Sequence, residues 1–527
     1  MGDRLTHRII RLTGSSVSDS PTIAPDEPEA LRAAIAYHQQ GQLDMADGLY
    51  QQVLQDTPDH VQALRLRAVL ARHRADYALS IELLEHLCQL EPGDVLPVNE
   101  LALSYMAAGE LYLAEQSLRA ALKIEPQSLQ ALANLGALLQ RRGFLEAAAE
   151  QYSAFLDIEP EDIEVRCNLA NALMEAGQDD LALTAISEAL KRSPGHPLIL
   201  ANKGAILCAQ EAYLEAVEVL EPVCQKGPVD DMALVNLGYA MRHSGDIHQS
   251  AEVLRAAVRV NPANARAVAD LANTEMQLGQ QAQALSRCAD FLAKYPGERL
   301  VTAAYILALN DAGQCDKAKA IQGLDELVTV IDISAPAGYE DLASFNRELV
   351  RLVTEHSSLI TDPVRKSTMG GAQTGELDGE GSPVMAAFIS VVTQAVNETV
   401  KVWEQAGLTH HPVMAYQAKR WMPRVWGTIL SAGGKQQPHL HPLGWISGVY
   451  YAGLPEEMAG KNQDDGALEL GTPPAHFYSK TEPDRRIVVP AEGRLVLFPS
   501  YCYHQTLPFK SKQQRISVAF DIVPLSR

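Results

Sequence analysis

Cysteine is scarce in this chain and is never paired in the sequence. The 527 residues include 7 cysteines, which lie far apart and form no C-x-x-C pair. An odd and scattered set argues against a disulfide framework and against a cysteine-based zinc cluster. We therefore expect small buried thiols in a reducing compartment.

Basic charge and long apolar runs are lacking as well. Lys and Arg number 44 against 65 Asp and Glu, and the formal net charge is −21. This balance argues against nucleic acid as a partner, because phosphate backbones repel an acidic surface. The chain has no uninterrupted run of about 18 apolar residues and no signal-peptide pattern at its start. The sequence therefore predicts no membrane span and a cytoplasmic location.

The length of the chain predicts more than one cooperative unit. A chain of 527 residues is longer than one hydrophobic core usually organises. Residues 1–29 are rich in Ser, Thr, Pro and Asp, and we expect a disordered tail there.

A repeat of 34 residues organises the segment that follows this tail. One position recurs every 34 residues from 41 to 313, and we call each occurrence a node of the repeat grid. Glycine occupies seven nodes, at Gly41, Gly109, Gly143, Gly177, Gly245, Gly279 and Gly313, and Ala75 and Glu211 occupy the other two. Five residues after each node stands Ala or Ser, at positions 46, 80, 114, 148, 182, 216, 250, 284 and 318. Proline stands seventeen residues after each of the first eight nodes, from Pro58 to Pro296.

Each marked position has a mechanical role in a pair of antiparallel helices. The node suits the tight turn between the helices, where a positive φ or a missing Cβ helps. The small residue lets the second helix approach the first, and the proline ends the second helix. Apolar residues between the marks recur at helical spacing, as at Leu132, Leu135 and Leu139. The array resembles the tetratricopeptide repeat, with eight full repeats and a partial ninth over residues 30–328.

A column of amides suggests what such a solenoid would hold. Asparagine stands nine residues before the turn residue in four consecutive repeats, as Asn134, Asn168, Asn202 and Asn236. The next repeat has Asp270 at this position. These positions belong to the first helix of each repeat, which faces the concave groove in the resembled family. Amides can donate to and accept from the backbone of an extended chain, as in the similar column of O-GlcNAc transferase. We therefore expect a protein or peptide partner in the groove, the alternative being that Asn is merely frequent here.

The periodicity stops after Leu324, and a β texture follows. Helices are expected over residues 339–355 and 383–406, with a Gly/Thr-rich loop at 366–374 between them. From Trp421 onward, β-branched and aromatic segments alternate with Gly and Pro turns: 425–430, 446–452, 467–470, 487–489, 494–498 and 515–523. Six strands without intervening helices predict an antiparallel sandwich or barrel.

Three histidines in this β region form a candidate metal site. His439 and His441 make an H-x-H, and side chains at i and i+2 of a strand point to one face. His504 follows the strand 494–498 and a turn, and a jelly-roll barrel would bring it beside the earlier pair. Imidazole ligates Fe, Zn, Cu and Ni, so the histidines alone name no metal. Taken singly, each histidine is more often an ordinary core or surface residue.

A candidate anion clamp lies on the last strand. Arg515 and Ser517 share a face of that strand, and a guanidinium can hold a carboxylate through two hydrogen bonds. On the strand after H-x-H, Tyr451 and Ser447 share a face, and we expect them to bind the same carboxylate. The alternatives are a surface arginine in an ion pair and an aromatic pair in the barrel core.

These features together resemble the 2-oxoglutarate- and iron(II)-dependent oxygenases, including prolyl- and aspartyl-hydroxylase-like members. The run HLHPLGWISGVYYAGLP from His439 to Pro455, the motif GGAQT at 370–374 and residues 493–524 are similar to a bacterial branch that often carries tetratricopeptide repeats. The resemblance covers about residues 360–524. It implies a multidomain chain, in which an all-α solenoid precedes a double-stranded β-helix (jelly roll) with flanking helices over residues 329–527.

The resemblance also implies a reaction and the residues that support it. Iron(II) would be held by His439, His441 and His504. The distal carboxylate of 2-oxoglutarate would bind the clamp, which consists of Arg515, Ser517, Tyr451 and Ser447. With O2, the cosubstrate becomes succinate and carbon dioxide, and a C–H bond nearby is hydroxylated. The protein supplies geometry and a water-poor pocket.

One departure from the family pattern concerns the ligand set. His441 stands where the common triad has an acid. Either three neutral imidazoles bind the metal, or only one of His439 and His441 does. In the second case water or an acid completes the sphere, and the conceivable acids are Asp464, Asp465 and Glu469. Related aspartyl hydroxylases lack the acid altogether.

Two other classes of protein remain open. A metal-binding cupin shares the barrel and H-x-H, but Trp445 stands where a cupin has glutamate, and a cupin needs no Arg515 clamp. A non-catalytic adaptor with an inactive barrel is the second alternative. The pairing of a groove with a barrel favours an oxygenase that hydroxylates a side chain of a protein or peptide.

Overall fold

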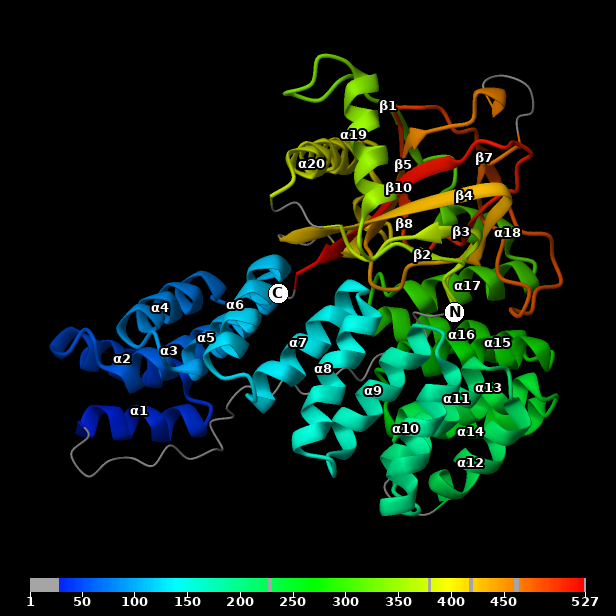
Figure 1. Ribbon diagram of the computed structural model, residues 1–527. Coiled ribbons are helices and arrows are strands. Elements are labelled where there is room, and N and C mark those ends of the chain that lie inside the picture. Colours follow the sequence, from blue (N-terminus) through cyan, green and yellow to red (C-terminus); the bar gives the residue numbers. More distant parts are fainter. Residues whose placement is uncertain (1–27, 226–229, 378–380, 417–419, 459–463, 526–527) are drawn as a thin grey trace. The chain divides into compact units, whose positions relative to one another are not determined.

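The computed structural model of this chain describes residues 28–225, 230–377, 381–416, 420–458 and 464–525 (Figure 1). The described residues form two compact units, one ending at Leu173 and the other running from Met174 to Leu525. The predicted disordered tail lies outside the described residues, except for Pro28 and Glu29. None of the helices within these ranges has the length and apolarity that crossing a bilayer requires.

The first unit consists of antiparallel helix pairs and the beginning of a ninth helix. Its complete helices are α1 (Glu29–Gln39), α2 (Leu43–Asp56), α3 (Val61–His73), α4 (Tyr77–Leu90), α5 (Val95–Ala108), α6 (Leu111–Ile124), α7 (Leu129–Arg142) and α8 (Leu145–Ile158). Helix α9 (Ile163–Glu175) spans the boundary between the two units.

The second unit continues the helix pairs before its sheet begins. These helices are α10 (Asp179–Arg192), α11 (Pro197–Ala209), α12 (Tyr213–Gln225), α13 (Asp231–His243), α14 (Ile247–Val260), α15 (Ala265–Gln277), α16 (Gln281–Lys294), α17 (Arg299–Asp311) and α18 (Cys315–Gln322). The last helix is short, as expected for a partial repeat.

The grid of marked residues performs the predicted roles. Every node has a positive φ, including the two that are not glycine, Ala75 at 60° and Glu211 at 62°. The left-handed turn is therefore set by the repeat and tolerates a side chain. All nine small residues of the second helices, from Ala46 to Ala318, are 0% exposed. The close helix approach predicted from their size is confirmed.

The β region is a curled antiparallel sheet, compatible with a jelly roll. Its strands run in the order β1-β8-β5-β10-β4-β9-β6-β7, and β3 joins β2 to β4. Their bounds are β1 (Thr329–Asp332), β2 (Ile360–Thr361), β3 (Thr368–Gln373), β4 (Trp421–His439), β5 (Ile446–Gly453), β6 (Leu468–Leu470), β7 (Arg486–Val488), β8 (Arg494–Pro499), β9 (His504–Thr506) and β10 (Arg515–Pro524).

The long strand β4 pairs with different strands along its length. Its first half pairs with β10, and its end pairs with β9, where His439 lies opposite His504. Between the halves, Gly434 and Gly370 approach so closely that a Cβ on Gly434 would lie 2.4 Å from the Gly370 carbonyl oxygen. The GGAQT motif is therefore a strand, β3, whose glycines permit this approach.

Two helices cover one face of the sheet, as Figure 1 shows for α19 (Leu342–Glu355) and α20 (Pro383–Gln405). Phe345 and Phe388 pack against the Tyr450 ring, whose hydroxyl donates to Asn346 Oδ1 at 2.5 Å. Because side chains alternate along β5, Tyr451 points to the opposite face. The predicted aromatic pair is thus divided between the helix-covered core and the interior of the curled sheet.

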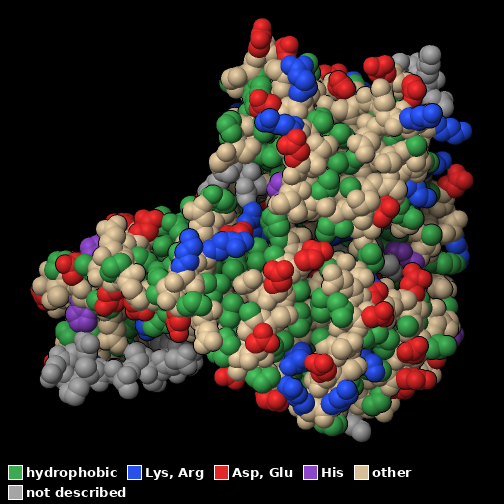
Figure 2. All heavy atoms as spheres, in the orientation of Figure 1, with side chains coloured by type: hydrophobic (Ala, Val, Ile, Leu, Met, Phe, Trp, Pro, Cys, Tyr) green, Lys and Arg blue, Asp and Glu red, His purple; other side chains and the backbone are tan. Residues whose placement is uncertain are grey.

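The last repeats and the sheet share one hydrophobic core. A single cluster of buried side chains extends from Val268 on α15 to Ile522 on β10. Tyr501 donates its hydroxyl proton to the Ile321 carbonyl at 2.9 Å, and Arg299 donates to the Leu443 carbonyl at 3.0 Å. On the visible surface of this unit, acidic and basic side chains are interspersed (Figure 2).

Candidate functional site

The three predicted histidines meet at one point of the curled sheet. The nearest ligand atoms of His439, His441 and His504 all lie within 4.8 Å of one another. Strand pairing explains two of them, because His439 ends β4 directly opposite His504 at the start of β9. His441 follows after one residue, and its ring centroid lies 4.8 Å from that of His504. The predicted gathering of three imidazoles is confirmed.

The hydrogen bonds of two rings orient them toward a common centre. His439 Nδ1 lies 2.7 Å from the Gln437 carbonyl oxygen, and His504 Nδ1 lies 3.1 Å from the Cys502 carbonyl oxygen. A carbonyl oxygen only accepts, so each Nδ1 carries the proton and each Nε2 keeps its lone pair. A lone pair on Nε2 is what a metal ion requires.

A carboxylate stands behind the third ring. His441 Nδ1 lies 2.6 Å from Asp521 Oδ1, which also accepts the Ser447 hydroxyl at 2.6 Å. Ser447 Oγ lies 2.8 Å from Ser500 Oγ, just beyond the end of β8, and all four residues of this network are buried. The acid missing from the ligand set is therefore present one step further out, where it fixes the histidine tautomer. The sequence analysis missed Asp521, although its spacing from Ser517 puts both on one face of β10.

The acids considered as extra ligands lie elsewhere. Within the described residues, the cluster contains only the three histidines. Glu469 accepts from Gln505 at 2.7 Å and from Thr472 at 2.5 Å. Asp464 is exposed at the surface. The three-imidazole interpretation is the one that the geometry favours.

Burial keeps the central histidine neutral. His504 is 5% exposed, and desolvation lowers its pKa well below the ordinary value, with His439 and His441 lowering it further. A neutral imidazole is the protonation state that ligates metals. The repulsion between charged rings disfavours protonation of His504, and its neutral ring offers a lone pair to a metal cation.

Arg515 is a buried cation with no carboxylate beside it. Its side chain is 1% exposed, its Nε donates to the Gly466 carbonyl at 3.1 Å and its Nη1 donates to Ser517 Oγ at 3.2 Å. Among the residues that the structure describes, no acid forms an ion pair with it. Burial lowers the pKa of Arg515, and the adjacent Tyr451 opposes that shift. A buried guanidinium without a counter-ion is costly unless a ligand supplies one.

Two more buried hydroxyls lie near this arginine, on residues that are paired with Ser517 across the sheet. Ser517 pairs with Tyr451 on one side and with Thr428 on the other, so their side chains share a face. Thr428 Oγ1 is buried and, within the described ranges, has no hydrogen-bond partner, whereas the buried Tyr451 hydroxyl faces Arg515. The Tyr451 ring centre lies 4.9 Å from the Arg515 guanidinium carbon. Thr428 was not predicted, because only the strand pairing brings it here.

The clamp and the metal cluster lie on one face at a suitable separation. Asp521 pairs with Ser447 and Ser517 pairs with Tyr451, so four residues, roughly 13 Å of strand, separate the two rungs. An arginine side chain and a small dicarboxylate together span such a gap. Ser447, which we predicted in the clamp, lies instead at the metal end with Asp521 and His441.

A tryptophan and a serine border the metal cluster. The half-buried Trp426 ring lies 5.4 Å from the His441 ring, and Ser367 Oγ lies 3.4 Å from His439 Nε2. Ser367 precedes β3 on the loop that follows β2. Neither residue carries a motif that sequence analysis could have recognised.

The predicted amide column is mostly buried within the repeats. Asn134 is 0% exposed and donates to Asn99 Oδ1 at 3.0 Å. Asn168 and Asn236 are 8% and 6% exposed, and Asn202 donates to the Leu198 carbonyl of its own helix at 2.8 Å. A peptide-binding role for these four residues stays a prediction, and the burial of Asn134 favours a scaffold role there.

Both the repeat segment and the β region match models of known protein families. Residues 424–521 match the family model described as "Putative 2OG-Fe(II) oxygenase". Residues 31–95, 167–231 and 235–299 match the tetratricopeptide repeat model. No curated protein matches the chain.

Several solved structures are similar to parts of the chain. A tetratricopeptide repeat protein from Parabacteroides merdae is 14% identical, with 44% of this chain and 92% of that chain covered and a TM-score of 0.39. Yeast Tom70 is 14% identical, with 60% and 69% covered and a TM-score of 0.45. MamA from Desulfovibrio magneticus RS-1 is 24% identical, with 31% and 93% covered and a TM-score of 0.28.

The 34-residue repeat agrees with the matches to the tetratricopeptide repeat model between residues 31 and 299, and the histidine cluster lies within the match over residues 424–521. The chain is a tetratricopeptide-repeat protein whose C-terminal domain matches the family described as "Putative 2OG-Fe(II) oxygenase".

Proposed function

We propose that this protein is an iron(II)- and 2-oxoglutarate-dependent dioxygenase that hydroxylates a side chain of a protein or peptide. The observation that carries the proposal is the buried Arg515, which has no acidic partner in the described residues and shares a sheet face with three converging histidines. A cupin or a structural zinc site needs the histidines but leaves the guanidinium without a function.

The donor set fits both absent groups. Three neutral imidazoles, two of them fixed by carbonyl acceptors and one by Asp521, suit a divalent transition metal with open coordination positions. Arg515 and three hydroxyls, on Ser517, Tyr451 and Thr428, suit one carboxylate of a dicarboxylic acid. When bound, iron(II) and 2-oxoglutarate supply the oxidising chemistry, and O2 supplies the oxygen atom that is added to a C–H bond.

The chain's own residues position these groups and exclude water. Arg515 neutralises and orients the distal carboxylate, and the buried rung around it keeps solvent from that end. Asp521 holds the proton on His441 Nδ1, which keeps Nε2 directed at the cluster. Trp426 and Ser367 border the side from which a substrate side chain would approach His439 and His441.

Anaerobic titration tests the assignment. Iron(II) followed by 2-oxoglutarate should produce a weak visible metal-to-ligand band, which reports chelation by the 2-oxo acid end. Arg515→Ala should weaken 2-oxoglutarate binding by on the order of 100-fold, because the distal carboxylate loses its charged partner. Arg494→Ala is the matched control, since Arg494 pairs with Asp332 on another part of the sheet. No band with the wild-type protein, or equal bands in both variants, would reject the oxygenase and favour an adaptor or a cupin.

The proposal that the substrate is a polypeptide is based on the repeats, because tetratricopeptide repeats generally mediate protein–protein interaction. Partners captured by a His504→Ala variant should become one oxygen atom heavier when treated with wild-type protein, iron(II), 2-oxoglutarate and O2. Mass spectrometry of the captured polypeptides would locate the modified side chain. Uncoupled turnover of 2-oxoglutarate without any modified polypeptide would contradict this part of the proposal.

A further inference from the structure

One loop of the sheet lies along the inner helices of the last repeats. It is the connection between β6 and β7, and we call residues His476–Lys480 of it the strap. The His476 ring lies 6.1 Å from the His243 ring on α13. The backbone N–H of Tyr478 donates to Asn273 Oδ1 on α15 at 2.9 Å, and that of Lys480 donates to Asp311 Oδ1 on α17 at 2.7 Å.

The strap is held as an extended peptide would be held. Every second residue reaches the next inner helix, so the segment runs along the repeats from α13 to α17. Side-chain oxygens that accept backbone N–H groups recognise the chain itself and not its sequence. Aromatic contacts add selectivity, because the Phe477 ring lies 5.5 Å from the Tyr503 ring, and the Tyr239 ring lies 4.2 Å from that of His243.

The fit between strap and helices is incomplete. Asn273 uses its Oδ1 but leaves Nδ2 buried without a hydrogen-bond partner in the described chain, and Asp311 likewise leaves Oδ2. The Thr481 hydroxyl, just beyond the strap, is also buried and unpaired there. Buried polar atoms that lack partners cost free energy, so an occupant that pairs them would bind better than the strap does.

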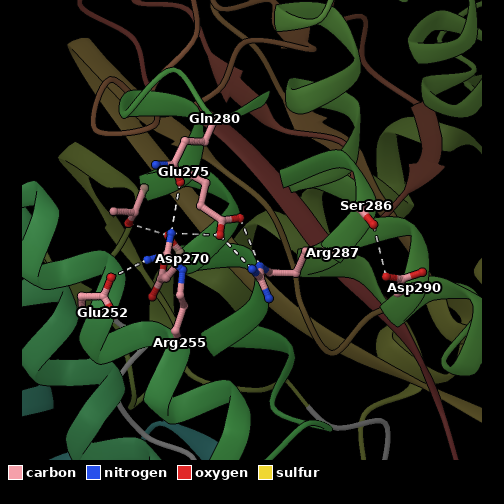
Figure 3. A network of polar contacts seen from close by, with 9 residues as sticks. Glu252, Arg255, Asp270, Glu275, Gln280, Ser286, Arg287 and Asp290 are labelled. Carbon is pink, nitrogen blue, oxygen red and sulfur yellow. Dashed lines mark hydrogen bonds and ion pairs between the residues drawn. The ribbon is translucent and has the colours of Figure 1, made fainter. Parts of the chain in front are cut away.

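A network of polar contacts surrounds Glu275 on the helix side, on α15 (Figure 3). Glu275 accepts two hydrogen bonds from Arg287, at 2.8 and 3.1 Å, and lies 3.5 Å from Arg255. This network joins α14, α15 and α16 two residues beyond Asn273. The network therefore braces α15, the helix that carries Asn273, against α14 and α16 through contacts in which the strap takes no part.

The strap side can leave without breaking the sheet. Leu470 pairs with Arg486, and Gly471 lies so close to Asp484 that a Cβ would be 2.0 Å from its carbonyl oxygen. The loop is thus closed at its neck, as in an Ω loop, and the strand pairs of β6 and β7 lie outside residues 472–483. The neck adjoins the metal cluster, since Leu470 pairs with His504.

We propose that the groove formed by α13, α15 and α17 is the binding site for an extended polypeptide with neighbouring aromatic side chains, and that the strap is a built-in occupant which this partner displaces. The inference rests on the proposed function only in taking the partner to be the substrate.

A binding experiment without metal or 2-oxoglutarate tests the groove directly. The probe is a fluorescent peptide with the sequence of residues 473–484, and the protein is the full chain. In one variant, residues 475–482 are replaced by a Gly/Ser segment of equal length. The peptide should bind this variant at least about tenfold more tightly than wild type, because a tethered competitor acts at millimolar effective concentration. Tyr478→Pro combined with Lys480→Pro, which deletes both backbone donors, should act in the same direction.

Groove variants decide whether the peptide occupies the proposed site. Asn273→Ala with Asp311→Ala, added to the Gly/Ser variant, should weaken peptide binding at least about tenfold. Gln283→Ala with Asp290→Ala on α16 is the matched control and should leave it unchanged. Equal binding by wild-type and Gly/Ser proteins, or by groove and control variants, overturns the proposal. Iron(II) and 2-oxoglutarate titration of the same proteins shows separately whether the oxygenase assignment stands.

Discussion

At the scale of single residues, the metal cluster depends on a carboxylate that does not touch the metal position. Asp521 accepts from both His441 and Ser447, each at 2.6 Å. Its charge stabilises a protonated Nδ1 and thereby raises the basicity of Nε2. A site with three neutral imidazoles gains from such a partner the negative charge that the usual acid would supply directly.

Removing this carboxylate should weaken metal binding without removing a ligand. We expect Asp521→Ala to lower iron(II) or cobalt(II) affinity by about 10–100-fold, and Asp521→Asn to lower it less, because an amide oxygen still accepts. Competition with a chromogenic chelator measures the affinity. Asp332→Asn, on the exposed pair with Arg494, serves as the control. Equal affinities for all variants would show that Asp521 only packs.

A second prediction at this scale uses an unpaired hydroxyl beside the clamp. Thr428→Val should weaken 2-oxoglutarate binding, yet stabilise the ligand-free protein by about 1 kcal/mol, because an unsatisfied buried hydroxyl disappears. Thr399→Val on α20 is a matched control, since its hydroxyl is also buried and has no partner in the described residues. The control should gain stability while its 2-oxoglutarate affinity stays unchanged. Chemical denaturation and isothermal titration separate the two effects.

Sequence reasoning found the residues that form local patterns and missed those that depend on strand pairing. His439 with His441 and Arg515 with Ser517 are i, i+2 pairs, so their shared face follows from strand geometry alone. Thr428 and Asp521 enter the site because β10 pairs with both β4 and β5, a register that no local pattern reveals. Ser447 was placed on the correct face but at the wrong end of the site for the same reason.

At the scale of elements, the loop between β2 and β3 links the repeats to the metal cluster. Arg365 donates to the carbonyls of Met174 and Ala209, near the ends of α9 and α11, and pairs with Asp179 at 2.8 Å. Two residues later, Ser367 Oγ lies 3.4 Å from His439 Nε2. Arg365 itself has a φ of 62°, a strained conformation that its contacts maintain.

Loss of the Arg365 side chain should therefore free this loop. Both Arg365→Ala and Arg365→Gly should accelerate hydrogen exchange over residues 362–370, although the glycine relieves the backbone strain. Metal affinity should fall less than in Asp521→Ala, because Arg365 bonds to Met174, Ala209 and Asp179, whereas Asp521 bonds directly to His441. Arg351→Ala, an exposed position on α19, is the control. Restored protection in Arg365→Gly would show that strain, and not the guanidinium contacts, governs the loop.

The elements that sequence analysis overlooked are short or rich in glycine. β3 contains Gly370 and Gly371, whose low strand propensity predicts a loop, and β9 contains only His504 to Thr506. Both exist because β4 offers them a long paired edge. A peptide-binding role for the amide column stays a prediction, and the amide that accepts a backbone N–H of the strap is Asn273, three residues beyond Asp270 on α15.

At the scale of the whole molecule, the repeats and the sheet do not separate where the sequence pattern changes. The periodicity predicts a boundary at residue 328, whereas the compact units divide at residues 173 and 174. The reason is the shared core, in which α15 to α18 cover one end of the sheet. Cys502, for example, is 2% exposed and lies 3.6 Å from the Gln322 carbonyl oxygen.

Truncation at the two boundaries should therefore give opposite results. A fragment of residues 161–527, which keeps α9 whole, should unfold cooperatively, whereas residues 329–527 alone should expose the surface that α17 and α18 bury and should aggregate. Cys502 reports the difference, because burial raises the pKa of its thiol and protects it from alkylation. Peptide mass mapping after a brief pulse of iodoacetamide should find Cys502 protected in the full chain and in the longer fragment, but modified in the shorter one. Equal protection in residues 329–527 would show that the sheet completes its core without the repeats, and that the shared core only docks two independent domains.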